Sequence, residues 1–167
     1  MKKFILLSAL IVLTFLQKAL AMDIIKLRDL YYQASTDKKA SEKFAIATSS
    51  ASDIEKTTLA GYSGMSWMIK ANHAFNPYNK LSYFFKGKDL LNGAIEADPK
   101  NVELRFLRYC VQTNAPAFLA YSGNIISDKT VIINSYSTIS DADLKKRIKE
   151  YMLNSKDCTA TEKRIFQ

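Results

Sequence analysis

Residues 76–109 decide the fold of this chain and read NPYNKLSYFFKGKDLLNGAIEADPKNVELRFLRY. Asn76 is a good N-cap, because its short side chain can accept a hydrogen bond from a backbone N–H that has no partner inside the helix. Pro77 follows at the first helical position, where its missing N–H costs nothing. Proline also disfavours α geometry in the residue before it, so Asp98 and Pro99 end this helix.

Apolar residues recur at helical spacing on both sides of that break. On the first helix they are Leu81, Phe84, Leu91, Ala94 and Ile95, and on the second, which Asn101 can cap, they are Val102, Phe106, Tyr109 and Cys110. Since only a few residues join the two helices, we expect them to pack as antiparallel neighbours.

The junction from Ala94 to Asn101, AIEADPKN, resembles the end of the second helix and the proline turn of a tetratricopeptide repeat. In that family the small residue at the place of Ala94 lets helices approach closely, and the proline at the place of Pro99 breaks the helix before the next repeat. The resemblance covers one repeat junction. It implies an all-α fold, with antiparallel helix pairs stacked as a short α–α superhelix, and a binding role.

Similar patterns bring the expected number of helices to about seven. Further helices are predicted over 23–34, 36–48, 52–74, 127–136 and 140–155, with a short turn after Pro116. Val131, Ile132 and Ile133 also permit a strand, but no second strand candidate exists to pair with it. The polar tail after Ser155 should be frayed. One all-α domain is therefore expected over residues 22–167.

The first 21 residues have the pattern of a bacterial signal peptide. Lys2 and Lys3 form a basic end, Phe4 to Leu16 is an apolar run of 13 residues, and Ala19 and Ala21 are the small residues that a signal peptidase reads. The run is short for a membrane span of ~20 residues. We expect cleavage after Ala21, a periplasmic or secreted protein, and no transmembrane span afterwards; an uncleaved N-terminal anchor is the alternative.

Removal of Lys2, Lys3 and Lys18 with the signal would lower the formal net charge from +8 to +5. Such a surface attracts lipopolysaccharide, acidic glycans or anionic lipid weakly. The basic residues are scattered rather than clustered on one element, so nucleic acid is not an expected partner. A soluble surface with a lysine surplus explains the same charge.

No catalytic or cofactor motif is found: the chain has no phosphate loop, dinucleotide fingerprint, zinc-finger spacing or paired-carboxylate motif. His73 is the only histidine, and no carboxylate stands four residues before or after it. A metal site is therefore not expected. His73 continues the apolar stripe through Ile69, which favours a packed side chain over a catalytic one. We expect no enzyme activity and no cofactor.

Six aromatic or cationic side chains on the predicted helices are candidates for ligand binding. They are Tyr62, Trp67, His73, Tyr83, Arg105 and Arg108. The aromatic rings can stack on sugars or peptides, and the two arginines, expected on the outer face of their helix, can bind an acidic partner. Packed aromatics and solvated charges are the alternatives.

Glycines and cysteines add two structural questions. Gly61 and Gly64 lie inside a predicted helix, where glycine costs up to ~1 kcal/mol relative to alanine. Close approach of a neighbouring helix explains them, and room for a ligand is the alternative. Cys110 and Cys158 are the only cysteines. An oxidising compartment permits a disulfide between them, although Cys110 also fits a core stripe as a small apolar residue.

Three functions from different classes follow. The first is a secreted, non-enzymatic adaptor of the cell envelope that binds another protein or an envelope component. The second is a small-molecule or lipid carrier with a pocket beside the helix that holds Gly61 and Gly64. The third is an enzyme centred on His73. An open concave groove favours the first, a closed apolar cavity the second, and a convergent polar pocket the third.

Overall fold

The computed structural model describes residues 23–167, and the signal-peptide prediction with its cleavage site lies outside that range. The α-helices are α2 (Ile24–Ala34), α3 (Lys38–Ser50), α4 (Lys56–His73), α5 (Pro77–Ala97), α6 (Val102–Asn114), α7 (Ile125–Ser135), α8 (Ala142–Asn154) and α9 (Ala160–Arg164), with 3-10 turns η1 (Ala117–Leu119) and η2 (Tyr136–Thr138). No strand occurs between residues 23 and 167, so the expected all-α class is confirmed. None of these helices is both long and apolar enough to cross a membrane.

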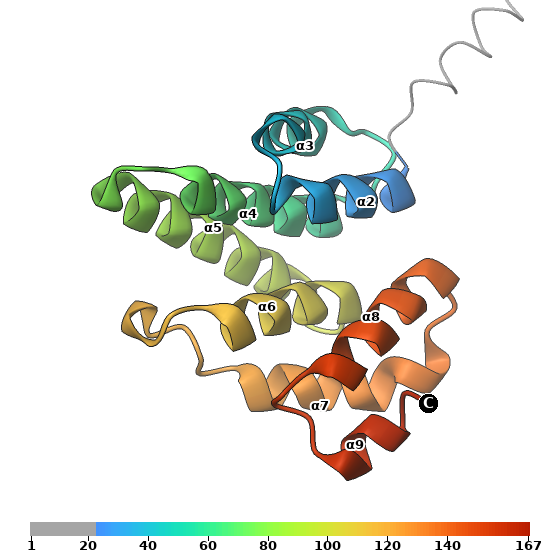
Figure 1. Ribbon diagram of the computed structural model, residues 1–167. Helices are drawn as coiled ribbons and strands as arrows, with labels where there is room; N and C mark the ends of the chain where they lie inside the picture. The colour runs from blue at the N-terminus through green and yellow to red at the C-terminus, as the bar shows by residue number, and fades with distance from the viewer. Residues whose placement is uncertain (1–22) are drawn as a thin grey trace, which may run out of the picture.

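Consecutive helices pack in pairs, and the pairs stack as a short superhelix. The pairs α4–α5 and α6–α7 run antiparallel, whereas α3 is seen nearly end-on beside α2 (Figure 1). α2 packs on α3, α4 on α5 and α6 on α7. α6 lies in the middle of the stack, because its opposite faces belong to two apolar clusters. Leu104 and Leu107 pack into the cluster of helices α2–α5, and Phe106 and Tyr109 pack into the cluster of helices α7–α9.

Glycines explain the close contact of α4 with α5. A Cβ atom on Gly64 would lie 2.7 Å from the carbonyl oxygen of Gly87, and one on Gly87 would lie 2.5 Å from the carbonyl oxygen of Gly64. A Cβ atom on Gly61 would collide with the side chain of Leu104. Gly61 and Gly64 therefore allow close helix packing, and the alternative of room for a ligand beside them is wrong.

Local capping chemistry sets the helix ends. The carboxylate of Glu55 accepts hydrogen bonds from the backbone N–H groups of Thr57 and Thr58, at 2.8 and 2.7 Å, and starts α4 at Lys56. These hydrogen bonds, together with one from the Thr57 hydroxyl, lower the pKa of Glu55 to about 2. The helix predicted from residue 52 thus begins four residues later, because Glu55 itself supplies the cap.

The C-terminal tail is ordered and packed, so the expectation that it frays is wrong. Thr159 and Glu162 form a reciprocal capping box that starts α9. Phe166 is fully buried and packs against the ring of Tyr136, with 4.7 Å between ring centroids. Burial of one aromatic anchor outweighs the polar composition of this segment.

Candidate binding groove

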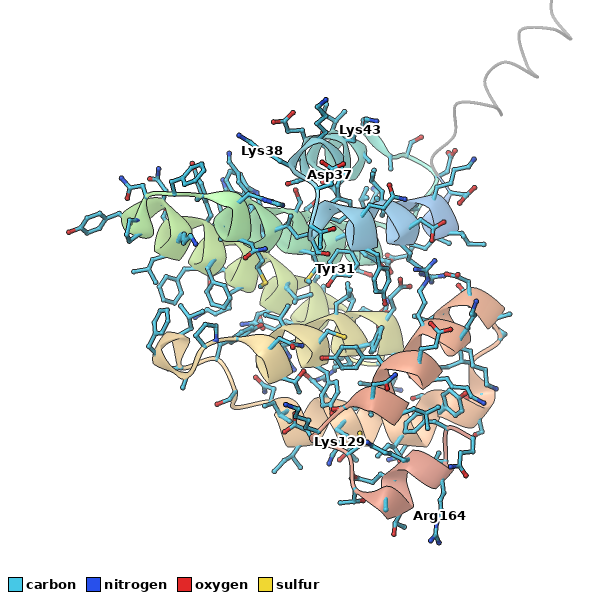
Figure 2. The ribbon with its side chains drawn as sticks, in the orientation of Figure 1. Tyr31, Asp37, Lys38, Lys43, Lys129 and Arg164 are labelled. Carbon is cyan, nitrogen blue, oxygen red and sulfur yellow. The ribbon has the colours of Figure 1, made fainter. Side chains whose placement is uncertain are left out.

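An apolar groove of about 570 Å³ separates helices α2, α4 and α5 from α6, η1 and α8. Its apolar lining comes from all six elements: Tyr31, Tyr32, Met65, Met68, Ile69, Ala71, Leu81, Phe84, Phe106, Leu107, Cys110, Val111, Ala115, Pro116, Phe118, Leu119 and Tyr151. Figure 2 shows Tyr31 on the side of α2 that faces α6, whereas Lys38 and Lys43 lie on α3 at the outer surface.

The groove has a buried floor and an exposed lip. Met65 and Leu107 form part of the floor and are each only 2% exposed. At the lip, Leu81 is 39% exposed and Phe118 is 77% exposed. Exposed apolar side chains that continue into a hollow of this size indicate a binding surface rather than an unfilled core.

The few polar groups of the groove wall are mostly neutral and already bonded. The hydroxyl of Tyr151 lies 2.6 Å from the hydroxyl of Thr113 and accepts a hydrogen bond from the amide of Asn114 at 2.7 Å. Burial raises the pKa of Tyr151 to about 12. The ring therefore stays uncharged at neutral pH, and among residues 23–167 only Lys80, at the lip, brings a charge to the groove.

Cys110 lies in the groove wall, and Cys158 lies in the C-terminal cluster. Both thiols are free, so the disulfide considered from the sequence is not formed. Burial raises the pKa of the Cys110 thiol well above its usual value. A protonated thiol is a poor nucleophile, so Cys110 contributes apolar surface to the groove rather than reactivity.

Ion pairs that we call the clamp link α2, α6 and α8 and centre on the buried side chain of Arg28: Arg28, Asp29, Glu103, Asp141, Asp143 and Arg147. Arg28 of α2 donates two hydrogen bonds of 2.7 Å to Glu103 of α6 and one of 3.0 Å to Asp143 of α8. Its guanidinium also lies 2.8 Å from Asp141, the N-cap of α8. Desolvation lowers the pKa of Arg28, but the hydrogen bonds and charges of these carboxylates outweigh it, so the pKa lies above its usual value and the guanidinium stays charged.

Arg147 extends the clamp along α8. It donates hydrogen bonds to Asp143 at 2.9 and 3.0 Å and to Asp29 of α2 at 2.5 Å. Its guanidinium also lies 5.0 Å from the ring centroid of Tyr32, which lines the groove. These contacts join α8 to α2 (Figure 1). The groove is lined by Tyr32 of α2, Tyr151 of α8 and Phe118 of η1.

The six ligand-binding candidates do not line the groove, and the structure does not bring them together at one site. Tyr62 is buried and donates a hydrogen bond of 2.6 Å to Glu103, which makes it a support of the clamp. His73 lies 2.8 Å from the carbonyl oxygen of Ala34 and joins the C-terminal ends of α4 and α2. Trp67 and Tyr83 pair on the α4–α5 surface with ring centroids 5.5 Å apart.

The outer-face placement of Arg105 and Arg108 is wrong. Both bind Asp128, a fully buried carboxylate in the first turn of α7, and Arg108 does so with two hydrogen bonds of 2.7 and 2.8 Å. Arg108 itself is only 6% exposed. α7 covers this face of α6, and the two arginines supply the cationic partners that the buried charge of Asp128 needs. Neither arginine is free to receive an acidic ligand.

The groove residues missed from the sequence include Leu107 and Val111 of α6. A helix that is apolar around most of its circumference is buried on more than one side, and Leu104, Phe106 and Leu107 give α6 that character. That pattern could have placed α6 between two layers. Comparison of the chain with protein-family models, curated proteins and solved structures finds no match.

Proposed function

We propose that this protein is a non-enzymatic binding protein of the bacterial cell envelope, whose groove receives the apolar face of a segment from another protein. The observation that carries this proposal is the open, apolar groove of about 570 Å³ between the two halves of the stack. Its envelope location rests on the signal-peptide pattern of residues 1–21. The likeness of residues 94–101 to a tetratricopeptide-repeat junction supports a role in protein binding.

The shape of the groove favours a peptide over an enclosed small molecule. Its lip is formed by Leu81 and Phe118, which are open to solvent, and its floor by packed side chains of α4 and α6. A groove walled by helices with apolar side chains suits an amphipathic helix, whose apolar residues recur every three or four positions. Lys80 at the lip can pair with an acidic residue on the polar face of such a segment.

The chemistry of the groove supports binding without catalysis. Its thiol, Cys110, has a raised pKa, and its hydroxyl, Tyr151, is bonded to Thr113 and Asn114. The single histidine lies outside the groove lining and is engaged with Ala34. Within residues 23–167, no nucleophile and base therefore lie together where a groove ligand would sit.

Site-specific photo-crosslinking tests the proposal. The crosslinking residue p-benzoylphenylalanine is introduced at position 81 or at position 90. Leu81 and Leu90 lie on the same helix and are 39% and 37% exposed, but only Leu81 lines the groove. In intact cells we expect a discrete protein adduct from position 81 and none from position 90. Val111→Asp in the position-81 background should abolish that adduct, because it places a charge in the groove.

Two outcomes would refute the protein-binding role. Equal adducts from both positions would show that contact is unrelated to the groove. A lipid found by native mass spectrometry in the purified protein, together with no protein adduct at position 81, would instead support the carrier hypothesis. Circular dichroism of each variant establishes that the helical fold is retained.

A further inference from the structure

The turn between α4 and α5, together with the first turn of α5, exposes two aromatic side chains to solvent. Phe75 is 98% exposed and Tyr78 is 83% exposed. The turn projects at one end of the molecule, on the same side as the chain that follows α6 (Figure 1). η1 adds Phe118, which is 77% exposed. Large apolar side chains gathered on a projecting end indicate an interaction surface, since their exposure opposes folding in water.

The part of these helices nearest the turn is basic, and the two acidic residues of α5, Asp89 and Glu96, lie in its C-terminal half. Between residues 56 and 88 the charged side chains are Lys56, Lys70, Lys80, Lys86 and Lys88, and no Asp or Glu occurs. None of these lysines forms an ion pair with residues 23–167. This surface therefore keeps its positive charge.

Several of these lysines make cation–π contacts with aromatic rings, which leave the positive charge of the ammonium group in place. The ammonium of Lys86 lies 3.7 Å from the ring centroid of Trp67, and that of Lys70 lies 4.6 Å from the ring centroid of Tyr83. Lys88 lies 5.1 Å from the ring of Phe85. Each lysine is thus held on the surface of the α4–α5 pair with its charge available to an anionic partner.

Neighbouring elements do not reverse the charge at this end. The α2–α3 turn is joined to the end of α4 by the contact of His73 with Ala34 and by a hydrogen bond of 3.3 Å from Asn72 to Ser35. That turn adds one carboxylate, Asp37, and two lysines at positions 38 and 39. The chain from residue 115 to 127, which includes η1, has no charged residue.

We propose that the tip of the α4–α5 hairpin docks this protein onto the surface of an anionic phospholipid bilayer. Phe75 and Tyr78 enter the headgroup region, where aromatic side chains are favoured, and the lysines face the lipid phosphates. A projecting, convex tip fits a deformable bilayer surface, whereas a protein partner would need a matching hollow. This docking does not depend on the groove being occupied, and it goes beyond the proposed function.

Position-specific fluorescence tests the contact on the full chain. Trp67 is the only tryptophan, so Phe75→Trp in a Trp67→Phe background reports from the tip alone. The matched control is Ile126→Trp in the same background, because Ile126 is 78% exposed on α7. With vesicles of phosphatidylglycerol and brominated phosphatidylcholine, we expect the emission at position 75 to shift to the blue and to be quenched, and the emission at position 126 to be unchanged.

Charge variants test the electrostatic part. Lys80→Glu with Lys86→Glu should weaken partitioning of the position-75 reporter onto these vesicles about 25-fold or more, since each lysine at an anionic surface contributes a factor of about five. The control is Lys146→Glu on α8, where the lysine side chain is 73% exposed. This change should alter partitioning of the position-75 reporter by no more than about twofold. Vesicles of phosphatidylcholine alone should bind weakly.

Three results would overturn the proposal. They are an unquenched tryptophan at position 75 on anionic vesicles, equal quenching at positions 75 and 126, and partitioning that is unaffected by the double lysine change. A vesicle contact made through any other part of the chain gives one of the first two results. Circular dichroism of every variant shows whether the helical stack is intact.

Discussion

Replacing Arg28 by methionine removes the central charge of the clamp and keeps an unbranched side chain in its place. The Arg28 side chain is 2% exposed and faces three carboxylates, of which Glu103 is 9% exposed, Asp143 is 21% exposed and Asp141 is 38% exposed. In Arg28→Met, Glu103 loses two hydrogen bonds of 2.7 Å and keeps the one from Tyr62. Its charge then stays buried without a cationic partner.

Removing one partner of a buried ion pair typically costs about 3–5 kcal/mol. Asp141 and Asp143 regain water in the variant because they are partly exposed, so their share of the loss is small. We therefore expect Arg28→Met to lower the free energy of unfolding by about 3 kcal/mol, mostly through Glu103. Urea unfolding followed by far-ultraviolet circular dichroism measures this value, provided that the m-value is unchanged.

The double variant Arg28→Met with Glu103→Gln distinguishes a buried charge from a general packing defect. Glutamine is neutral and still accepts the hydrogen bond from Tyr62, so the double variant should recover at least about half of the lost stability. A loss below about 1 kcal/mol in Arg28→Met would refute the clamp. The clamp would also be refuted if Glu103→Gln lowered the free energy of unfolding as much in the Arg28→Met background as in the wild type.

Two further predictions concern the α4–α5 contact and pH. Gly87→Ala should destabilise the protein by at least about 2 kcal/mol in urea unfolding, because the added Cβ would meet the α4 backbone. Gly93→Ala should instead stabilise it by ~0.5–1 kcal/mol, since a Cβ there would meet nothing within 4 Å. Equal effects of the two changes would contradict the glycine contact. Hydrogen bonds from Arg147 and then Arg28 lower the pKa of Asp143. Desolvation raises the pKa of Asp141, but the hydrogen bonds from Arg28 and the Leu144 N–H outweigh it and bring this pKa below 3.8. The stability that these two carboxylates contribute is therefore complete above about pH 4 and is lost as the pH falls through their folded pKa values. Below about pH 4 the melting temperature should thus drop less steeply in Arg28→Met than in the wild type. Parallel plots of melting temperature against pH for the two proteins would contradict a contribution from the clamp.

Local signals in the sequence located most helix ends. Asn76 and Asn101 cap α5 and α6 as predicted, because an N-cap depends only on a short polar side chain and the next three backbone N–H groups. Asp23 and Asp37 cap α2 and α3, close to the predicted starts at residues 23 and 36. α7 instead begins at Ile125, two residues before the predicted start at residue 127, and Asp128 lies in its first turn, in the buried pair with Arg108.

The candidate site could not be predicted in the same way, because it depends on which helix faces remain uncovered. Leu81 continues the apolar stripe of α5 but lies 39% exposed at the groove lip, while Leu91 of the same stripe is fully buried. Arg108 was placed at the surface because its partner, Asp128, lies on the next helix and no local pattern links them. Periodicity identifies the apolar face of each helix, and only the tertiary arrangement decides what covers it.

If the groove is a binding surface, photo-crosslinking in intact cells should distinguish position 81 from position 90. We expect a discrete adduct at the groove lip and none on the opposite face of α5. The same adduct at both positions, or a position-81 adduct that persists in Val111→Asp, would contradict it.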